Sequence, residues 1–525
     1  MISLLDYGAG NVRSVINALE RLGETVQTVK SGQDIKNAQR LVFPGVGSFG
    51  AMMTILRKKN FITPLTEYLE SGKPFFGICL GLQALFETSE EAPGVSGLSI
   101  IPGTVKRFTI DLAVPHIGWN GIKVRQPSRL FNGVEGDEKF YFVHSYHVVP
   151  ASEEFVLTAT DYGYEFVSAI RKNNIVATQF HPEKSGKAGL ALLKNFLDTT
   201  REEIIPSSCP RQTRLAKRII ACLDVRANDQ GDLVVTKGDQ YDVREEGNVR
   251  NLGKPVQLAG RYYEEGVDEI TFLNITGFRD FPLKDMPMIE VLENTSKNVF
   301  VPLTIGGGIR DYKDKDGRQY SALEVASEYF RSGADKISIG SDAVLIVENV
   351  LQSGKSTGLS SIEQIARVYG NQAVVISVDP RRIYVQSPEA VKHHTIKTSF
   401  PGPNGEEYCW YQCTIRGGRE GRELDAVTLA RVCEQLGAGE ILLNCIDKDG
   451  TNAGFDLELI NAVKSAVSIP VIASSGAGSA EHFLEVFTDT QAEAALAAGI
   501  FHRQEISIGE IKDYLQGKVE TRPIY

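Results

Sequence analysis

A cysteine, a histidine and a glutamate have the types and spacing that nucleophilic chemistry needs. Cys79 stands between two glycines in GICLG, after the apolar run KPFFGI and before the helical pattern LQALFE. Such a strand–turn–helix elbow exposes the thiol near a helix N-terminus, which favours the thiolate. His181 and Glu183 follow the predicted strand 173–178 in QFHPEKSG. A histidine can deprotonate the thiol and a carboxylate can hold its tautomer, so the three predict a catalytic triad. For GICLG alone, a small buried cysteine after a strand is the alternative.

A glycine turn could complete this site. Gly45 and Gly47 follow another apolar strand in PGVGSFG. Glycines allow the backbone conformations that aim amide groups at an oxyanion. The turn is therefore a candidate oxyanion hole, although a glycine-rich turn by itself indicates little.

Two aspartates at equivalent points of an internal repeat form a second candidate site. Asp224 ends the apolar run 218–224, and Asp379 ends the run 373–379. The repeat also aligns GVDEITFLNIT with GAGEILLNCID, and LTIGGGI with VIASSGAG. Carboxylates at the carboxyl ends of barrel strands can act as an acid–base pair, whereas loop-capping aspartates are the structural alternative.

The same repeat predicts two phosphate sites. Backbone amides near glycines and helix starts hold phosphate oxygens. A substrate with a phosphate at each end would fit the paired geometry. One site would use Gly307, Gly308 and Ser341, and the other Gly450, Thr451, Gly476 and Gly499.

The elements that must position these residues are those of two α/β domains. Residues 1–204 alternate strands with helices, as in a mostly parallel sheet covered on both faces. Residues 205–216 contain two prolines and predict a linker. Residues 217–525 contain eight candidate strands, which favours a (β/α)8 TIM barrel over an open doubly wound sheet. These strands are expected at 218–224, 269–274, 299–304, 335–340, 373–379, 440–445, 470–474 and 494–498.

The segment 380–422 interrupts the second half of the predicted barrel. Its glycine, proline and charged residues predict a long loop. Cys409 and Cys413 lie four residues apart in it, with no second pair at the spacing of zinc ligands. A metal site is therefore not expected there.

Four charged residues lie at or near the amino ends of four predicted strands. Two positive and two negative side chains could form a ring of ion pairs at the bottom of the barrel. Residues on that face usually concern stability, so a structural plug is one interpretation. The four are Arg218, Glu269, Lys336 and Glu440.

Composition and charge exclude several classes of protein. The 525 residues carry a net charge of −10, which argues against a general nucleic-acid binder. Seven cysteines, a sparse and odd number, argue against a disulfide-built secreted protein. The start MISLLDYGAGN lacks the features of a signal peptide, and no apolar run reaches about 18 residues. We therefore expect a soluble intracellular protein that binds neither nucleic acid nor membrane and needs no metal or organic cofactor.

GICLGLQ, QFHPEKSG and PGVG together resemble the motifs of class I glutamine amidotransferases, over roughly residues 1–200. The resemblance implies a flavodoxin-like open sheet, and cleavage of glutamine through a thioester on Cys79 with release of ammonia. It places Gln83 in the glutamine pocket. The segment YFVHSY is similar to one that helps to bind glutamine, which implies that role for His144, Ser145 and Tyr146.

Six segments carry a second resemblance, which runs from Lys217 almost to the C-terminus. They are KRIIACLDV, TIGGGI, DKISIG, ISVDP, GAGEILLNCIDKDGT and IASSGAG. Together they resemble the cyclase barrels of the imidazole glycerol phosphate synthase family. The substrate of that family is a formimino-carboxamide ribonucleotide with phosphoribulosyl and phosphoribosyl groups. The resemblance implies that the ring of charges gates ammonia into a conduit through the barrel. The rise per residue of the strands gives this conduit a length of about 20–25 Å. Both parts in one chain match the eukaryotic form, which favours a monomer. We expect it in the cytoplasm, with a plastid form that has lost its targeting segment left open.

Two positions depart from the pattern of that family. Two alternative functions for the chain also stay open. Asn274 stands where many members have aspartate, and Ser475 stands where glycine is commoner. A related barrel that isomerises an aminoaldose phosphate shares the two aspartates and phosphate sites, but it needs no fused glutaminase. A regulatory scaffold with an inactive glutaminase is the non-enzyme alternative, against which the intact cysteine, histidine and glutamate argue.

Overall fold

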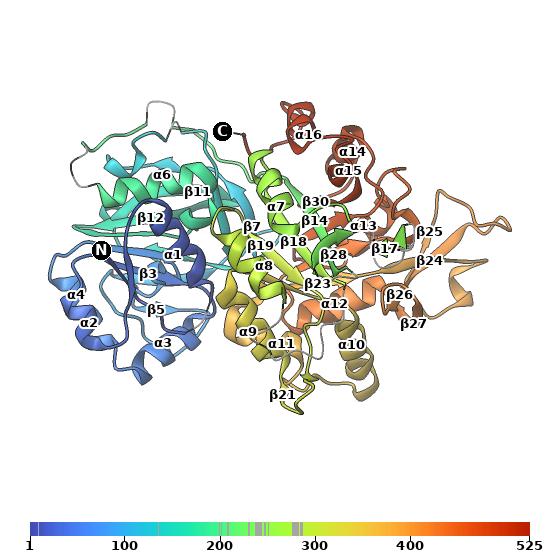
Figure 1. The fold of residues 1–525 in the computed structure, drawn as a ribbon, viewed down its shortest axis with the longest axis horizontal. Helices are drawn as coiled ribbons and strands as arrows, with labels where there is room; N and C mark the ends of the chain where they lie inside the picture. The colour runs from blue at the N-terminus through green and yellow to red at the C-terminus, as the bar shows by residue number, and fades with distance from the viewer. Residues whose placement is uncertain are drawn as a thin grey trace.

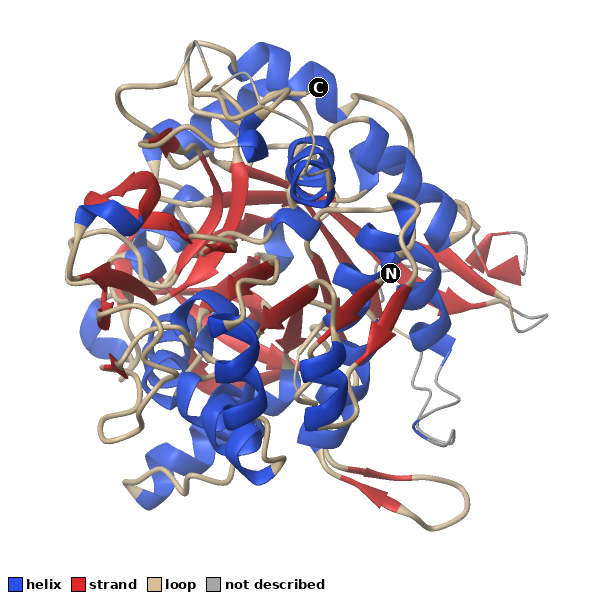
Figure 2. Cartoon of the chain, turned by 90° about the vertical axis from the view of Figure 1, so that its left-hand side faces the viewer, coloured by secondary structure: helices blue, strands red, loops and turns tan. Residues whose placement is uncertain are grey.

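Buried strands and helices with one buried face organise the whole chain into two α/β bodies. They lie side by side in Figure 1, with the first at the left in blue to green and the second at the right in green to red. Helices flank the central strands in Figure 2. The computed structural model describes residues 1–8, 10–134, 136–198, 200, 202–206, 209–228, 232–236, 251–275, 283 and 287–524, with the backbone of 244–245 and 248–249.

The first body is built on an open sheet whose central strands are parallel, as the sequence predicts. Every residue of β3 and β4 is buried, as is typical of strands covered on both faces. The parallel strands run in the order β2 (Val26–Thr28), β1 (Ile2–Leu4), β3 (Leu41–Gly45), β4 (Phe75–Cys79) and β13 (Ile175–Thr178). The sheet continues through the antiparallel strands β12 (Tyr164–Lys172), β10 (Tyr146–Pro150) and β6 (Gly103–Arg107). Its main helices are α1 (Val12–Arg21), α3 (Phe49–Lys58), α4 (Ile62–Glu70) and α6 (Gly186–Leu197).

The second body is a closed barrel of eight parallel strands, which confirms the predicted TIM barrel. The first strand pairs with the last, so that Arg218 lies opposite Ala494 and the sheet has no open edge. All eight predicted strands are present, although the one expected at 299–304 begins only at Leu303. They are β14 (Arg218–Ala227), β18 (Glu269–Asn274), β19 (Leu303–Gly306), β22 (Lys336–Ile339), β23 (Val374–Val378), β28 (Glu440–Asn444), β29 (Val471–Ser474) and β30 (Ala494–Ala497).

Polar caps fix where several barrel helices begin. Ser321 and Ser360 form capping boxes at the starts of α9 (Ala322–Ser332) and α11 (Ser361–Tyr369). In the described part of the chain, none of the helices has the length and apolar character needed to span a membrane.

The segment 380–422 is not a long loop, and that prediction is wrong. It forms most of a four-stranded antiparallel sheet, which projects from the right of the barrel in Figure 1. The central strand pairs with three partners, and it buries Cys409 and Cys413 as free thiols. The backbone groups that a loop would expose to water are thus paired within the insertion. The strands are β24 (Pro380–Val385), β25 (Thr395–Lys397), β26 (Tyr408–Ile415) and β27 (Glu420–Asp425).

The first body sits on the amino-terminal end of the barrel. Its hairpin of β7 (His116–Asn120) and β9 (Phe140–His144) reaches the barrel, where the Trp119 Nε1 donates to the Asp268 carbonyl at 3.0 Å. Lys184 and Asp335 form a 2.7 Å ion pair across the same junction. The strand ends that carry the predicted ring of charges therefore face the first body.

Candidate active sites

Cys79 stands at the end of β4 in a backbone conformation that few residues adopt. Its φ is 54° and its ψ is −104°, at the entry to the short helix α5 (Leu80–Gln83). The flanking glycines are required by close packing, since a Cβ on Gly81 would lie 2.0 Å from the Phe43 carbonyl oxygen. A Cβ on Gly77 would lie 2.8 Å from the Gly81 carbonyl oxygen. GICLG therefore forms the strained elbow that the sequence predicts.

His181 and Glu183 lie beside this elbow, both buried. His181 Nδ1 and Glu183 Oε1 are 2.8 Å apart, which leaves the other ring nitrogen for the sulfur. Burial lowers the pKa of His181, but Glu183 and Cys79 outweigh this effect and hold the pKa well above its usual value. The structure thus brings together the nucleophile, base and orienting carboxylate expected from the sequence.

The glycine turn lies next to Cys79 through strand pairing. Gly45 lies directly opposite Cys79 in the parallel ladder of β3 and β4. A Cβ on Gly45 would lie 2.3 Å from the Leu80 Cβ, so only glycine fits there. Gly47 has a φ of 122°, also suited to glycine. The amide of Val46, between the two glycines, donates to the Tyr7 hydroxyl at 3.2 Å.

The residues expected to bind glutamine divide into two groups. Gln83 is buried near Cys79, and its Nε2 donates to the Tyr146 carbonyl at 3.1 Å. Among the described residues, its Oε1 has no hydrogen-bond partner. His144 instead lies in a cluster of buried rings, with Nε2 3.2 Å from His116 Nδ1 and Nδ1 2.7 Å from the Tyr146 carbonyl oxygen. Both ring nitrogens of His144 are therefore engaged by protein atoms.

Ser145 contributes a backbone contact at this point. Its carbonyl oxygen accepts the Phe108 amide at 3.1 Å, which fixes the start of β10.

Two nearby side chains were not predicted from the sequence. Gln179 is fully buried, and its Nε2 lies 3.4 Å from the Cys79 sulfur. Glu91 accepts the Phe49 amide at 2.8 Å, just beyond the glycine turn, and burial raises the pKa of its carboxyl to about 7. Neither residue belongs to a spacing pattern, because the contacts join segments up to 100 residues apart.

The four predicted charges form a closed ring at the bottom of the barrel. All four side chains are buried, and each cation contacts both anions. Arg218 lies 2.7 Å from Glu269, and Lys336 lies 2.6 Å from Glu269 and 2.7 Å from Glu440. Arg218 also pairs with Glu440. The Thr304 hydroxyl donates to Glu269 at 2.7 Å, which holds one carboxylate in place.

Small and apolar side chains fill the space above this ring, along the inside of the barrel. They form a separate buried cluster, lined by strands on all sides. Such an interior excludes charged species and gives a neutral molecule no strong partner. The cluster consists of Ile220, Cys222, Val375, Leu442, Ile472, Ala494 and Leu496.

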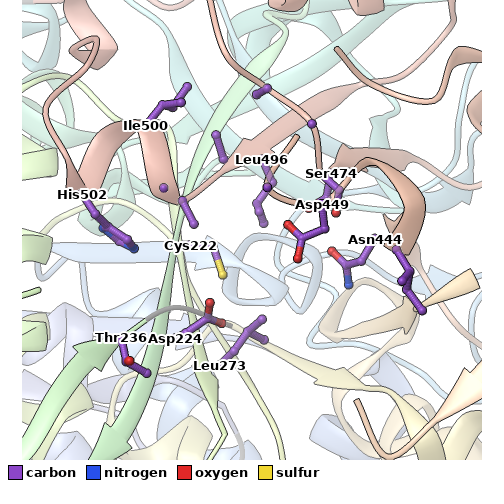
Figure 3. Close-up of a pocket in the computed structure, with 18 of the residues that line it drawn as sticks. Cys222, Asp224, Thr236, Leu273, Asn444, Asp449, Ser474, Leu496, Ile500 and His502 are labelled. Atoms are coloured by element: carbon purple, nitrogen blue, oxygen red, sulfur yellow. The ribbon is translucent and has the colours of Figure 1, made fainter. Parts of the chain in front are cut away.

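Asp224 and Asp379 face the mouth at the other end of the barrel. Asp224 lies within the first strand, which continues to Ala227 beyond the end predicted for it, and Asp379 directly follows the fifth strand. These two strands stand opposite each other in the barrel. Asp224 lines one pocket, and Asp379 lines both that pocket and an adjoining one. Figure 3 shows Cys222 and Asp224 on one side of the first pocket, with Asn444 and Asp449 across it.

The carboxyl of Asp379 has a distinctive environment. Burial raises its pKa above the usual range, a hydrogen bond from Asn444 lowers it, and the charge of Asp449 raises it again. The Asn444 Nδ2 donates to Asp379 Oδ1 at 2.9 Å. A carboxyl with a raised pKa is suited to proton transfer near neutral pH.

Each of the two pockets is lined by one of the two predicted sets of phosphate-binding residues, with one exception. Asn274 lines the second pocket and Ser475, with a φ of 73°, lines the first. Thr451 lines neither, and its hydroxyl donates to the Lys448 carbonyl at 2.7 Å. The first pocket includes Gly450, Gly476 and Gly499, and the second includes Gly307, Gly308 and Ser341.

Three arginines at the second pocket were not predicted from the sequence. A phosphate in this pocket would meet their positive charge as well as backbone amides. They are Arg310, Arg416 and Arg419. Across the described residues, no group of three or more histidine, cysteine, aspartate or glutamate side chains could hold a metal ion.

Comparisons with known proteins agree for both bodies. Residues 3–200 match the family described as glutamine amidotransferase class-I, and residues 218–507 match the family described as histidine biosynthesis protein. The chain is 58% identical to the chloroplastic imidazole glycerol phosphate synthase hisHF of Arabidopsis thaliana, over 99% of this chain and 89% of that protein. It is 57% identical to the hisHF of Schizosaccharomyces pombe, over 98% of each. It is 54% identical to that of Emericella nidulans, again over 98% of each. The chain belongs to the family of bifunctional imidazole glycerol phosphate synthases, enzymes of histidine biosynthesis in which a glutamine amidotransferase domain is fused to a cyclase barrel.

Proposed function

We propose that this chain makes ammonia from glutamine at Cys79 and uses it at the mouth of the barrel. The observation that carries the proposal is the arrangement of the two sites. The triad lies over the bottom of the barrel and the two aspartates lie at its top. An apolar interior connects them, and a ring of four charges closes it at the triad end.

The glutaminase step uses the thiolate of Cys79 as nucleophile. It attacks the side-chain amide carbon of glutamine, while His181 takes the thiol proton and passes it to the departing ammonia. Glu183 holds the ring in the required tautomer and stabilises its positive charge. Backbone amides of the turn at Gly45 and Gly47 stabilise the oxyanion. Water then hydrolyses the thioester and releases glutamate.

Substrate glutamine is held beside this turn. The Oε1 of Gln83, a buried acceptor with no partner among the described residues, suits an N–H of the substrate. The segment at Ser145 and Tyr146 supplies backbone groups, while His144 supports it from behind through the Tyr146 carbonyl.

Ammonia then passes the ring of Arg218, Glu269, Lys336 and Glu440. The ring is closed by ion pairs, so passage requires at least one pair to part. Only the neutral form would cross the apolar interior above it at low cost, because desolvating ammonium is expensive. The ring thus acts as the gate.

The cyclase step takes place between Asp224 and Asp379. The doubly phosphorylated formimino-carboxamide ribonucleotide would lie across the mouth, with one phosphate in each pocket. One aspartate removes protons from the added ammonia and the other donates to the leaving nitrogen, so that ring closure and cleavage can follow. The products are imidazole glycerol phosphate and aminoimidazole carboxamide ribotide. Glycine-rich loops and Ser341 hold the phosphates.

We also propose domain limits and a cellular setting for the chain. We assign residues 1–204 to the glutaminase and residues 217–525 to the cyclase, with 205–216 as linker. With both domains in one chain, a monomer is sufficient for the coupled reaction. A cytoplasmic enzyme and a plastid enzyme would use the same sites.

Two variants test the proposal. Cys79→Ala should abolish glutamine-dependent turnover and keep turnover with added ammonium salts. Asp224→Asn should abolish both. If a folded Cys79→Ala protein also lost its ammonium-dependent activity, the division into two sites would be wrong. Glutamate release by the parent chain excludes the alternative of a scaffold with an inactive glutaminase.

A further inference from the structure

We propose that Gln179 is a positioning residue that orients and stabilises the Cys79 thiolate, a proposal that rests on the glutaminase function above. Gln179 follows β13 and precedes the triad histidine by two residues. Its side chain is fully buried, and its Nε2 lies 3.4 Å from the Cys79 sulfur. A sulfur contact of this length is a hydrogen bond from an amide donor.

The contact belongs to a chain of side-chain amides that starts at β10. The Gln83 Nε2 donates to the Tyr146 carbonyl at 3.1 Å and to Gln179 Oε1 at 3.2 Å. Gln179 then donates its own amide hydrogen to Cys79. Two side chains, those of Gln83 and Gln179, thereby connect the glutamine-binding segment to the nucleophile.

The direction of this chain is fixed by chemistry. A backbone carbonyl can only accept, so the group of Gln83 that faces Tyr146 must be its NH₂. The same NH₂ faces Gln179, which must therefore present its oxygen to Gln83. This leaves only the NH₂ of Gln179 to face the sulfur of Cys79. The nucleophile thus meets a donor and not an acceptor, whatever its protonation state.

A donor at this position favours the reactive form of the cysteine. A thiolate accepts a hydrogen bond more strongly than a thiol does, so Gln179 stabilises the thiolate relative to the thiol. His181 contributes positive charge by a separate route. Gln179 also restricts the sulfur to one rotamer on a backbone already held in a strained conformation.

The hydrogen-bonded amides of Gln83 and Gln179 couple the Cys79 thiolate to the binding of substrate in the glutamine pocket. The free Oε1 of Gln83 is the only oxygen of these two amides that, within the described residues, lacks a hydrogen-bond partner. A substrate N–H bound there polarises the Gln83 amide and strengthens its donation to Gln179. Substrate binding and thiolate stabilisation are then parts of one network.

The test compares Gln179→Met, Gln179→Glu and Cys79→Ala in the full chain. Met keeps the length of the side chain and removes the donor, whereas Glu keeps the shape and presents an oxygen to the sulfur. Gln126→Met is the matched control, because that side chain amide also donates hydrogen bonds in the same domain, to the carbonyls of Glu154 and Val156, but lies away from the site. The readouts are iodoacetamide alkylation of Cys79 against pH, followed by peptide mass spectrometry, and the steady-state constants for glutamine.

We expect Gln179→Met to slow alkylation near pH 7 and to lower the kcat for glutamine by about tenfold to a hundredfold, as for one hydrogen bond to a charged group. KM should change by less than about threefold, because Gln179 does not contact substrate. Gln179→Glu should lose more and should move the alkylation profile to higher pH. Ammonium-dependent turnover, which needs no thiol, should stay within about twofold in each variant and shows that the barrel is folded.

Parent-like alkylation and kcat in Gln179→Met would overturn the role of Gln179, provided that Cys79→Ala still abolishes glutamine use. If Cys79→Ala instead kept glutamine-dependent turnover, the proposed glutaminase function would fail, whatever Gln179 does. Should Gln179→Met not fold, Gln179→Glu decides alone, and an unchanged alkylation profile in that variant contradicts the proposal.

Discussion

Gly47 of the glycine turn lies against Val368 at the end of barrel helix α11. A Cβ on Gly47 would lie 2.7 Å from the Val368 carbonyl oxygen, and the φ of Gly47 is 122°. The neighbouring Ser48 binds the same helix end, with its amide 3.3 Å from the Val368 oxygen and its hydroxyl 3.0 Å from the Arg367 oxygen. The turn that lies beside the nucleophile in one domain is therefore held by the other domain.

Substitution of Gly47→Ala should disable the glutaminase without damaging the cyclase. The added methyl group must push the turn away from Val368, which moves the proposed oxyanion donors. We expect glutamine-dependent kcat to fall by about 10²-fold, as for the loss of an oxyanion donor. Turnover with ammonium salts should be unchanged. Gly23→Ala is the control, because that glycine also has a positive φ but no atom within 4 Å of its Cβ position. Equal kinetics in the two variants would contradict the prediction.

Removal of one cation from the ring should be costly for stability. Lys336→Met leaves Glu269 and Glu440 buried with Arg218 as the remaining cation of the ring. Breaking a buried ion pair typically costs about 3–5 kcal/mol. Urea denaturation should show a loss of this size for the barrel transition.

The same variant should also uncouple the two reactions. Glutamate release should exceed formation of imidazole glycerol phosphate, because the proposed gate has lost two of its four ion pairs. Lys397→Met removes a cation from an exposed pair with Glu407 and should cost no more than about 1 kcal/mol. A Lys336→Met protein as stable as Lys397→Met would show that the ring contributes nothing.

Loss of Asn444 should move the pH profile of the cyclase reaction upward. The hydrogen bond from Asn444 lowers the pKa of Asp379, which burial raises. Asn444→Ala removes the lowering effect, so the pKa of Asp379 rises further. In the pH profile of the ammonium-dependent reaction, the limb that reports the ionisation of Asp379 should therefore shift to higher pH. Asn461→Ala, at an exposed helix position, is the control. A shift to lower pH would contradict the assignment.

Glu91 should make stability depend on pH in a specific window. Its folded pKa of about 7 lies above the ordinary value of 4.5, so the folded protein holds this proton more tightly than the unfolded chain. Its contribution to stability is complete below about pH 4.5 and is lost as pH rises to about 7. Glu91→Gln keeps an acceptor for the Phe49 amide and does not titrate. The variant should therefore gain stability relative to the parent at pH 8, on the order of 1–3 kcal/mol.

Urea denaturation at pH 5 and at pH 8 measures this difference. At pH 5 the two proteins should be nearly equal in stability. If the difference between them were the same at both pH values, the carboxyl of Glu91 would not titrate in this window.

The sequence predicts most of the fold because its signals are local. Each barrel strand contains a short apolar run, and Asp224 and Asp379 follow such runs directly, although β14 itself continues to Ala227. The sequence also predicts which three residues lie together at the elbow, since GICLG and QFHPEKSG are each continuous. The sheet of the insertion is not predictable in this way, because β24 and β26 are separated by more than 20 residues with no tight turn between them. Their pairing depends on contacts that no local pattern contains.

Side-chain networks are harder to predict for a related reason. Gln179 meets Cys79 only because β13 and β4 are neighbours in the sheet. Thr451 follows Gly450 in the sequence, yet its side chain does not line the pocket that Gly450 lines. The direction of a loop side chain depends on the tertiary structure, which spacing alone does not determine.

Closure of the barrel has a consequence for how the chain acquires its native state. The ring draws on β14, β18, β22 and β28, and the sheet is complete only when β14 meets β30. Pairing of such distant segments is slow, because the entropy of a very long loop must be overcome first. The glutaminase domain contacts the barrel end where the ring lies. A barrel that has not closed presents an incomplete docking surface, so assembly of the two domains selects for correctly folded barrels.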